Sequence, residues 1–219
     1  MSTSVKGAGR GRVEISGAER RAAQGAATRE ALLAAARSCF GETGFAETSL
    51  DEVVRKAKVT KGALYHHFGG KEDLFAAVYE QVLREVSDSV VSRFLEPDAW
   101  SALLAGCELW VEAHLDPTVQ RIVLRDARAA LGWDVVRDVE NRYGVVPLRG
   151  VLRRAVRQGA IGDFPLRPLA LMVMGSLNEA CLYVAEADDP DRARAEVRLL
   201  VERGLSGLID RPSPAPSSA

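Results

Sequence analysis

The sequence lacks the features of a membrane, secreted or metal-binding protein. Its longest apolar run, Leu169 to Leu177, is far shorter than the roughly 20 residues that a membrane span needs. The first 25 residues contain no apolar block, so we expect no signal peptide. The three cysteines, Cys39, Cys107 and Cys181, are scattered and form no CxxC pair. We interpret them as reduced core thiols of a cytoplasmic protein, with metal or redox roles as the alternative.

The sequence also lacks the residue patterns of an enzyme or a metal site. No set of nucleophile, acid and base stands at a recognisable spacing, and His114 alone at a predicted helix end is weak support for catalysis. The adjacent His66 and His67 lie about 100° apart on a helix, so they are poorly placed to chelate one ion. We therefore predict no catalytic residues, no metal and no cofactor.

Charge is distributed unevenly along a chain whose formal net charge is only −1. Residues 1–71 carry 12 Lys+Arg against 7 Asp+Glu, a net of +5, whereas residues 72–219 carry 17 against 23, a net of −6. All five lysines lie in the first part: Lys6, Lys56, Lys58, Lys61 and Lys71. A basic segment on an acidic body is typical of nucleic-acid binding, although a solvated surface gives the same counts.

Apolar periodicity predicts an all-α protein whose first three helices form a helix-turn-helix. The pattern between residues 32 and 40 predicts a helix from Thr28 to Gly41, capped by Thr28. Ser49 and Glu52 form a capping box that begins a second helix, which ends near residue 57. Thr60 can cap a third helix only three residues later. Two helices joined by so tight a turn must cross steeply.

The segment VTKGALYHHFGGKEDL, from Val59 to Leu74, predicts a surface that touches DNA. Leu64 and Phe68 are four residues apart and form the buried side of the third helix. The outward side is expected to contain Gly62, Ala63, Tyr65, His66 and His67. The two small residues allow close approach, and the three rings can hydrogen-bond phosphates or base edges. Lys71 opens the next helix, where an external phosphate would offset its unfavourable interaction with the helix dipole.

The stretch FAETSLDEVVRKAKVTKGALYHHFGGKEDLF resembles the DNA-binding domain of the tetracycline-repressor (TetR) family of transcriptional regulators. The resemblance spans Thr28 to Phe75, with its capped helix, four-residue turn, LYxHF and KExL. It implies base or groove contacts from Lys61, Gly62, Ala63 and His66. It implies phosphate contacts from Ser49, Thr60, Tyr65, His67 and Lys71.

Two residues depart from the pattern of that family. Lys58 occupies the turn position where the family usually has glycine, and a non-glycine residue in a left-handed conformation costs roughly 1 kcal/mol. Val54 replaces a usual alanine and is expected to separate the second and third helices slightly. Both changes bear on the angle at which the protein docks on DNA.

The rest of the chain resembles the family's effector-binding and dimerisation domain. An apolar stripe from Leu74 to Val86 predicts a connecting helix of about 20 residues, and a second stripe runs from Trp100 to His114. The segments DPTVQRIVLRDARAALGW and LMVMGSLNEACLYVA resemble one C-terminal subgroup of the family. Pro147 and the GAIG segment at 159–162 are expected to interrupt helices. We predict a flexible basic arm at 1–25, a DNA-binding domain at 26–73, the effector and dimerisation domain at 74–209, and a disordered tail at 210–219.

Two C-terminal helices are predicted to form a four-helix dimer interface, as in the resembling family. The segment Pro168–Ala187 is apolar almost all round and needs cover on two sides, although a fully buried helix in a monomer is the alternative. The last helix has an apolar stripe and small residues that permit close approach. The predicted interface residues are Met174, Cys181, Val197, Leu200, Val201, Gly204, Leu205 and Leu208.

The central helices are predicted to bind a small, mostly apolar effector. The candidate residues combine large apolar surfaces with a few polar tips: Trp110, His114, Trp133, Tyr143 and Asn178. Core packing is the alternative for the aromatic residues, and a helix-end cation or core hydrogen bond is the alternative for His114. Arg125 and Arg128 are expected to pair with nearby acids, or else to face an anionic effector.

Together these features predict a ligand-responsive repressor in the cytoplasm. It would bind a palindromic double-stranded DNA operator as a homodimer and be released by its effector. An activator or a ligand-independent regulator is the alternative. An architectural DNA-binding protein would have no need of the large acidic C-terminal part. The arm with Arg10, Arg12, Arg20 and Arg21 either enters a minor groove or is a plain solvated terminus.

Overall fold

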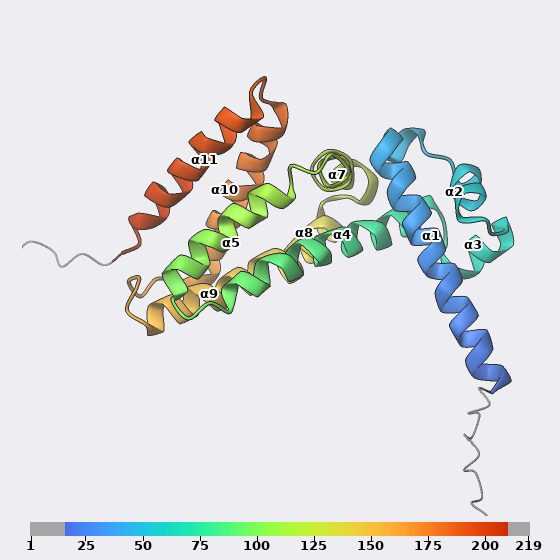
Figure 1. Cartoon of the computed structure of the whole chain (residues 1–219), viewed down its shortest axis with the longest axis horizontal. Coiled ribbons are helices and arrows are strands. Elements are labelled where there is room, and N and C mark those ends of the chain that lie inside the picture. The colour runs from blue at the N-terminus through green and yellow to red at the C-terminus, as the bar shows by residue number, and fades with distance from the viewer. Residues whose placement is uncertain (1–15, 210–219) are drawn as a thin grey trace, which may run out of the picture.

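A computed structural model describes residues 16–209, and every regular element in that range is a helix (Figure 1). The predicted all-α class is therefore confirmed. In chain order the elements are α1 (Gly17–Glu47), α2 (Leu50–Ala57), α3 (Lys61–His67), α4 (Lys71–Phe94), α5 (Ala99–Ala113), α6 (Pro117–Val119), η1 (Gln120–Asp126), α7 (Ala127–Leu131), α8 (Trp133–Glu140), η2 (Asn141–Val145), α9 (Val146–Arg157), α10 (Leu166–Glu186) and α11 (Pro190–Ser206). The predicted tail at 210–219 lies outside the described residues.

The first helix begins earlier than the sequence pattern predicted. Ser16, not Thr28, is the N-cap: its side chain accepts from the Glu19 amide, and the Glu19 carboxylate accepts from the Ser16 amide. Thr28 lies inside the helix and donates its hydroxyl to the Gln24 carbonyl. The prediction of a flexible arm is wrong for residues 17–25, because a capping box and alanine-rich sequence favour helix there. Residues 1–15 of that predicted arm lie outside the described part.

Helices α1, α2 and α3 pack as the predicted helix-turn-helix unit around a small core. Leu32, Ala36 and Phe40 of α1 are fully buried, as are Val53 of α2 and Leu64 of α3. Helix α1 continues through a kink at Gly44, where φ is 88°. Beyond that kink, Phe45 packs edge-on against Phe75 of α4. This aromatic contact joins the three-helix unit to the connecting helix.

Helix α4 connects the two parts of the molecule, and its 24 residues agree with the predicted long helix. Its buried stripe from Leu74 to Val90 packs on α1 at one end and on α5 toward the other (Figure 1). A rigid helix of this length spans about 36 Å at 1.5 Å per residue.

The central helices are distorted rather than broken. The chain is helical without interruption from Trp133 to Arg157, passing through α8, the π-helical η2 and α9. Pro147 stands in the first turn of α9, where a missing amide costs least. The predicted interruption at Pro147 takes the form of a π-helical distortion directly before it, at Asn141–Val145, and not of a break in the helical chain. The predicted break after α9 is confirmed, with Gly159 at a φ of 68°.

Helices α10 and α11 lie side by side at the end of the molecule farthest from α3 (Figure 1). One face of α10 packs on α5, α9 and η2 through Ala170, Met174 and Leu177. By length and composition α10 is the one described helix apolar enough to cross a membrane, with a mean hydropathy of 1.3. Core helices of soluble proteins pass the same test, and here one side of α10 is buried in the helical core.

Candidate functional site

Local capping signals position α2 and α3. The Ser49 hydroxyl accepts from the Glu52 amide, and the Thr60 hydroxyl accepts from the Ala63 amide, both at 3.2 Å. Both N-cap predictions are confirmed, although only this half of the Ser49–Glu52 box is formed in the described chain. Lys58 ends α2 in the left-handed conformation, with φ 57° and ψ 39°. The turn after α2 thus holds a lysine in the left-handed backbone conformation that usually favours glycine.

The outer face of α3 is open to solvent, and its inner face is core. Leu64 and Phe68 are buried as predicted, whereas Tyr65 is 53% exposed and His66 is exposed. A methyl group added at Gly62 would meet only the Thr60 Oγ1, at 3.9 Å. The backbone at the start of α3 is therefore bare. A bare backbone beside hydrogen-bonding side chains is suited to close contact with a nucleic-acid surface.

Two of the predicted DNA-contacting lysines already have partners within the chain. The Lys61 Nζ lies 2.8 Å from the Asp51 Oδ1, and this hydrogen bond raises the pKa of Lys61 above its ordinary value. Lys71 donates from Nζ to the Ala46 carbonyl at 2.9 Å and lies over the Phe45 ring. The Lys61 pair is exposed, so exchanging it for a phosphate costs little. Lys71 is held more firmly, because its ammonium group both donates to a backbone carbonyl and lies over an aromatic ring.

Three of the five predicted effector residues form one interior cluster. The Trp110 Nε1 donates to the Asn178 Oδ1 at 3.2 Å, which joins α5 to α10. The His114 ring stacks near Trp110, and its Nδ1 lies 2.7 Å from the Trp110 carbonyl oxygen. Burial lowers the pKa of His114 below its ordinary value, so the ring is neutral near pH 7.

The remaining two candidates lie on either side of this cluster. Tyr143 donates its hydroxyl to the Glu80 Oε1 of α4 at 3.0 Å and lines, with Trp110, an apolar cavity of only about 10 Å³. Trp133 is half exposed, stacks under the Arg128 guanidinium, and lines with Asn178 an outer cavity of about 390 Å³. The Arg128 guanidinium thus covers the indole ring of Trp133. Neither Arg125 nor Arg128 forms an ion pair among the described residues, so the predicted pairing with acids is not found there. The apolar cavity holds no more than about one water molecule, so the interior is closed.

Two polar residues of this interior were missed by the sequence analysis. Glu140 lines the outer cavity and accepts from the Asn178 Nδ2 at 3.4 Å, and its partial burial raises the pKa of its carboxyl group. Tyr79 of α4 is fully buried, and its hydroxyl has no partner among the described residues. Burial raises the pKa of Tyr79 as well. No local sequence signal marks either residue, because each lies within an ordinary helical stripe.

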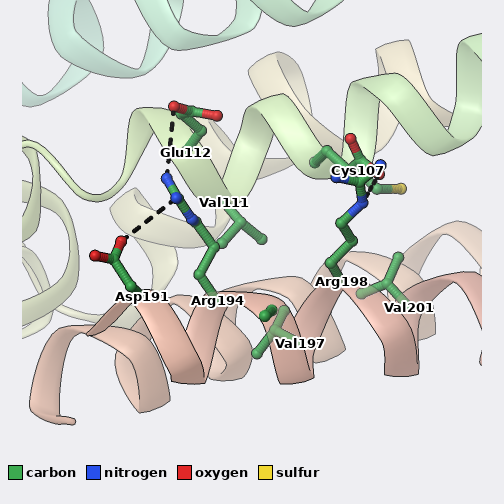
Figure 2. Close-up of a pocket in the computed structure, with 10 residues that line it drawn as sticks. Cys107, Val111, Glu112, Asp191, Arg194, Val197, Arg198 and Val201 are labelled. Carbon is green, nitrogen blue, oxygen red and sulfur yellow. Dashed lines mark ion pairs between the residues drawn. The ribbon is translucent and has the colours of Figure 1, made fainter. Parts of the chain in front are cut away.

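A groove of about 410 Å³ separates α5 from α11 (Figure 2). Its floor is apolar and includes Val111 and Val197. Arg198 of α11 pairs with Glu108 of α5 at 2.9 Å. Arg194 lies between Glu112 and Asp191, at 3.9 Å and 3.4 Å. Because α5 also carries Trp110, these ion pairs connect the interior cluster to the last helix.

The predicted dimer residues divide into two groups. Val197 and Leu205, at 7% exposure, line an open groove formed by α10 and α11, so their part in a dimer surface stays a prediction. Met174 and Cys181 are buried, at 5% and 1% exposure, and are not among the residues that line this groove, which contradicts their assignment to a dimer surface. They face the core of their own chain because α10 and α11 pack on α5 and on each other. Gly204 is exposed, Leu200 is 68% exposed, and Val201 and Leu208 are half-buried. These four residues, with Met172 at 71% exposure, also line this open apolar groove, whose volume is about 430 Å³.

Comparisons with known proteins agree with this arrangement. Residues 32–78 match the model of the bacterial regulatory proteins of the tetR family, and residues 100–208 match a tetracyclin repressor-like C-terminal domain. A probable acrEF/envCD operon repressor of Escherichia coli K12 is 34% identical over 155 residues, which cover 67% of this chain and 70% of that protein. A crystal structure of a TetR-family transcriptional regulator from Pectobacterium atrosepticum is 38% identical, with a TM-score of 0.76. The alignment covers 87% of this chain and 98% of that one. The TetC protein of transposon Tn10 from E. coli is 28% identical over 134 residues, covering 61% of this chain and 68% of that protein.

Proposed function

Because the chain belongs to the TetR family of DNA-binding transcriptional regulators, we propose that it is a repressor that binds a palindromic operator as a homodimer and is released by a small effector. Family members and relatives of this chain are regulators rather than enzymes. A repressor of this kind acts on DNA in the cytoplasm. An activator or a ligand-independent regulator would use the same DNA-binding unit, and these remain the alternative outcomes of the experiments below.

The observation that carries the proposal is the open face of α3. Gly62 and Ala63 leave the backbone accessible, Lys61 stands beside them, and His66 and Tyr65 extend into solvent. In our proposal Lys61, Gly62, Ala63 and His66 contact the groove and bases. Phosphates would be bound by Ser49, Thr60, Tyr65, His67 and Lys71. Phosphate contacts set the position on the duplex, and base contacts supply the sequence preference.

Substitution of Gly62 separates DNA contact from fold. A methyl group at this position meets no protein atom closer than 3.9 Å, and alanine is the better helix former by roughly 1 kcal/mol. Gly62→Ala should therefore keep or raise the unfolding temperature while lowering operator affinity at least tenfold. A Gly150→Ala variant is the matched control, since Gly150 is also helical with nothing within 4 Å. Equal operator affinity for both variants would contradict close approach of α3 to DNA.

The exposed apolar groove on α10 and α11 supports a dimer. Met172 and Leu200 are large apolar side chains that the protomer leaves mostly in water. A contiguous apolar patch of this kind marks an interaction surface. Pairing with the same surface of a second copy by two-fold symmetry would cover it. In our proposal this dimer presents both α3 helices to one DNA duplex. Two such helices fit successive major grooves about 34–36 Å apart.

The interior is closed, so an effector that binds there would have to move helices apart, and this movement is the basis of the proposed switch. The cavity beside Trp110 and Tyr143 is too small for a ligand, so binding there must separate α5 from α10 or from η2. The movement would reach DNA along α4, which carries Glu80 as the partner of Tyr143. It would reach the dimer surface through the Arg198–Glu108 pair. A tenfold loss of DNA affinity requires about 1.4 kcal/mol of preference for the opened state.

The switch is tested by screening small apolar molecules that carry one or two polar groups. Thermal shift identifies the binders, and anisotropy of a labelled operator then measures release of DNA. Trp110→Phe keeps most of the apolar surface but removes the hydrogen bond to Asn178. It should weaken the response to a releasing ligand without abolishing DNA binding. A ligand that stabilises the protein but leaves operator affinity unchanged would refute the switch, and a normal response in Trp110→Phe would refute the assigned pocket.

A further inference from the structure

The N-terminal end of α1 extends past the helix-turn-helix unit. Gly25 lies beside α3, since a methyl group built on it would be 3.9 Å from the His67 Cε1. Arg29, one turn further into the chain, lies over the Phe68 ring at 5.3 Å. Arg21 is one turn in the opposite direction, about 6 Å beyond Gly25 along the helix axis. Figure 1 shows this end of α1 projecting past α3 into solvent.

Arg21, Gly25 and Arg29 share one face of α1. Residues at positions i, i+4 and i+8 of a helix lie in one row, and the middle and inner members of this row contact the end of α3. The outer member, Arg21, therefore continues the line that begins at Phe68 and His67. Arg20 is rotated by about 100° from Arg21 and lies off that row. The two neighbouring arginines thus carry the same charge but lie on different faces of the helix.

The projecting segment has no partner within the protomer. Residues 16–24 are all exposed, and neither Arg20 nor Arg21 forms an ion pair with any residue in the described range 16–209. The Ser16–Glu19 box and the alanines make the segment helical without tertiary packing. A short helix that is exposed all round is marginal alone in water, and it gains stability when it docks.

We propose that the Arg21 face of α1 is a second DNA contact, which binds backbone phosphates adjacent to those bound through His67. The charge supports this occupant: Gly17 to Arg29 contains three arginines and one glutamate. The position supports it as well, because the row starts at the C-terminal end of α3, where His67 is half-buried and in reach of the duplex in the proposed docking. The inference rests on the proposed function. The proposed contact of Arg21 with the phosphates is independent of base sequence, because a guanidinium bound to phosphate does not contact the bases.

The experiment compares Arg21→Ala with Arg20→Ala in the full-length protein. The probe is the duplex that the wild-type protein enriches most from a random pool, with flanking sequence retained on both sides. Each variant loses one positive charge at an exposed site, so folding is unaffected in both. Arg21→Ala should flatten the dependence of log K on log salt by about one per protomer and leave the preferred sequence unchanged. Arg20→Ala should keep the wild-type slope. Equal slopes for the two variants would overturn the inference.

Gly25→Ala provides an independent readout. The added methyl makes an ordinary contact with His67, and alanine stiffens the helix that presents Arg21. Affinity should rise about two- to fivefold in the wild-type background and stay unchanged in the Arg21→Ala background. The same gain in both backgrounds, or none in either, would overturn the inference. If the wild-type protein enriches no sequence at all, the proposed function fails together with this contact. If the wild-type protein binds and only the Arg21 comparison fails, the proposed function stands.

Discussion

Leu200→Ala should dissociate the homodimer without unfolding the protomer. The side chain is 68% exposed on α11 and lines the open apolar groove with Met172. The substitution removes three carbons, each worth about 0.8 kcal/mol when fully buried. Scaled by the exposed fraction, the loss is about 1.6 kcal/mol per copy. Two-fold symmetry places the residue twice in the interface, so the dimer loses about 3 kcal/mol.

A loss of this size raises the dimer dissociation constant about 200-fold. Sedimentation velocity across a dilution series measures it directly. Leu95→Ala is the matched control, because Leu95 is 77% exposed, follows the C-terminal end of α4 and is not among the residues that line the apolar groove of α10 and α11. Both variants should keep the helical content and unfolding cooperativity of the wild type. The reasoning is refuted if Leu200→Ala dissociates no more readily than Leu95→Ala.

Three further substitutions test single features of the fold and the site. Lys58→Gly should raise the free energy of unfolding by about 0.5–1 kcal/mol, measured in urea, because it removes a side chain from a φ of 57°. His114→Gln should remove a pH dependence of stability. Because burial lowers the pKa of His114 below 6.5, wild-type stability should be highest above pH 6.5 and fall as the pH drops towards the lowered folded-state pKa. His66→Ala should weaken base preference by about 1–3 kcal/mol at one or two positions per half-site, read from selected sequences, with unchanged stability.

The helix-turn-helix unit could be predicted because its signals are local. Ser49 and Thr60 are capping residues at the right distance from the turn, and Leu64 and Phe68 are four residues apart. The start of α1 could not be predicted from apolar periodicity, because residues 17–27 have no apolar stripe. The Ser16–Glu19 capping box was the signal available there.

The proposed dimer surface and the proposed effector site depend on tertiary packing that the sequence does not encode locally. Helix α10 is apolar on both sides, so its pattern could not say whether Met174 or Met172 faces the core. The hydrogen bond of Trp110 to Asn178 joins residues 68 positions apart. The partial burial of Glu140 likewise results from the packing of α8 on α4 and of η2 on α10. Such features become predictable only when the arrangement of the helices is known.

Selection of bound fragments from random double-stranded DNA tests the central claim most directly. Two identical α3 helices related by two-fold symmetry should enrich an inverted repeat, with half-site centres about one helical turn or slightly more apart. Affinity should fall sharply when one half-site is scrambled. Enrichment of a single, non-repeated half-site, bound by a monomer with no affinity gained from a second copy, would contradict the account.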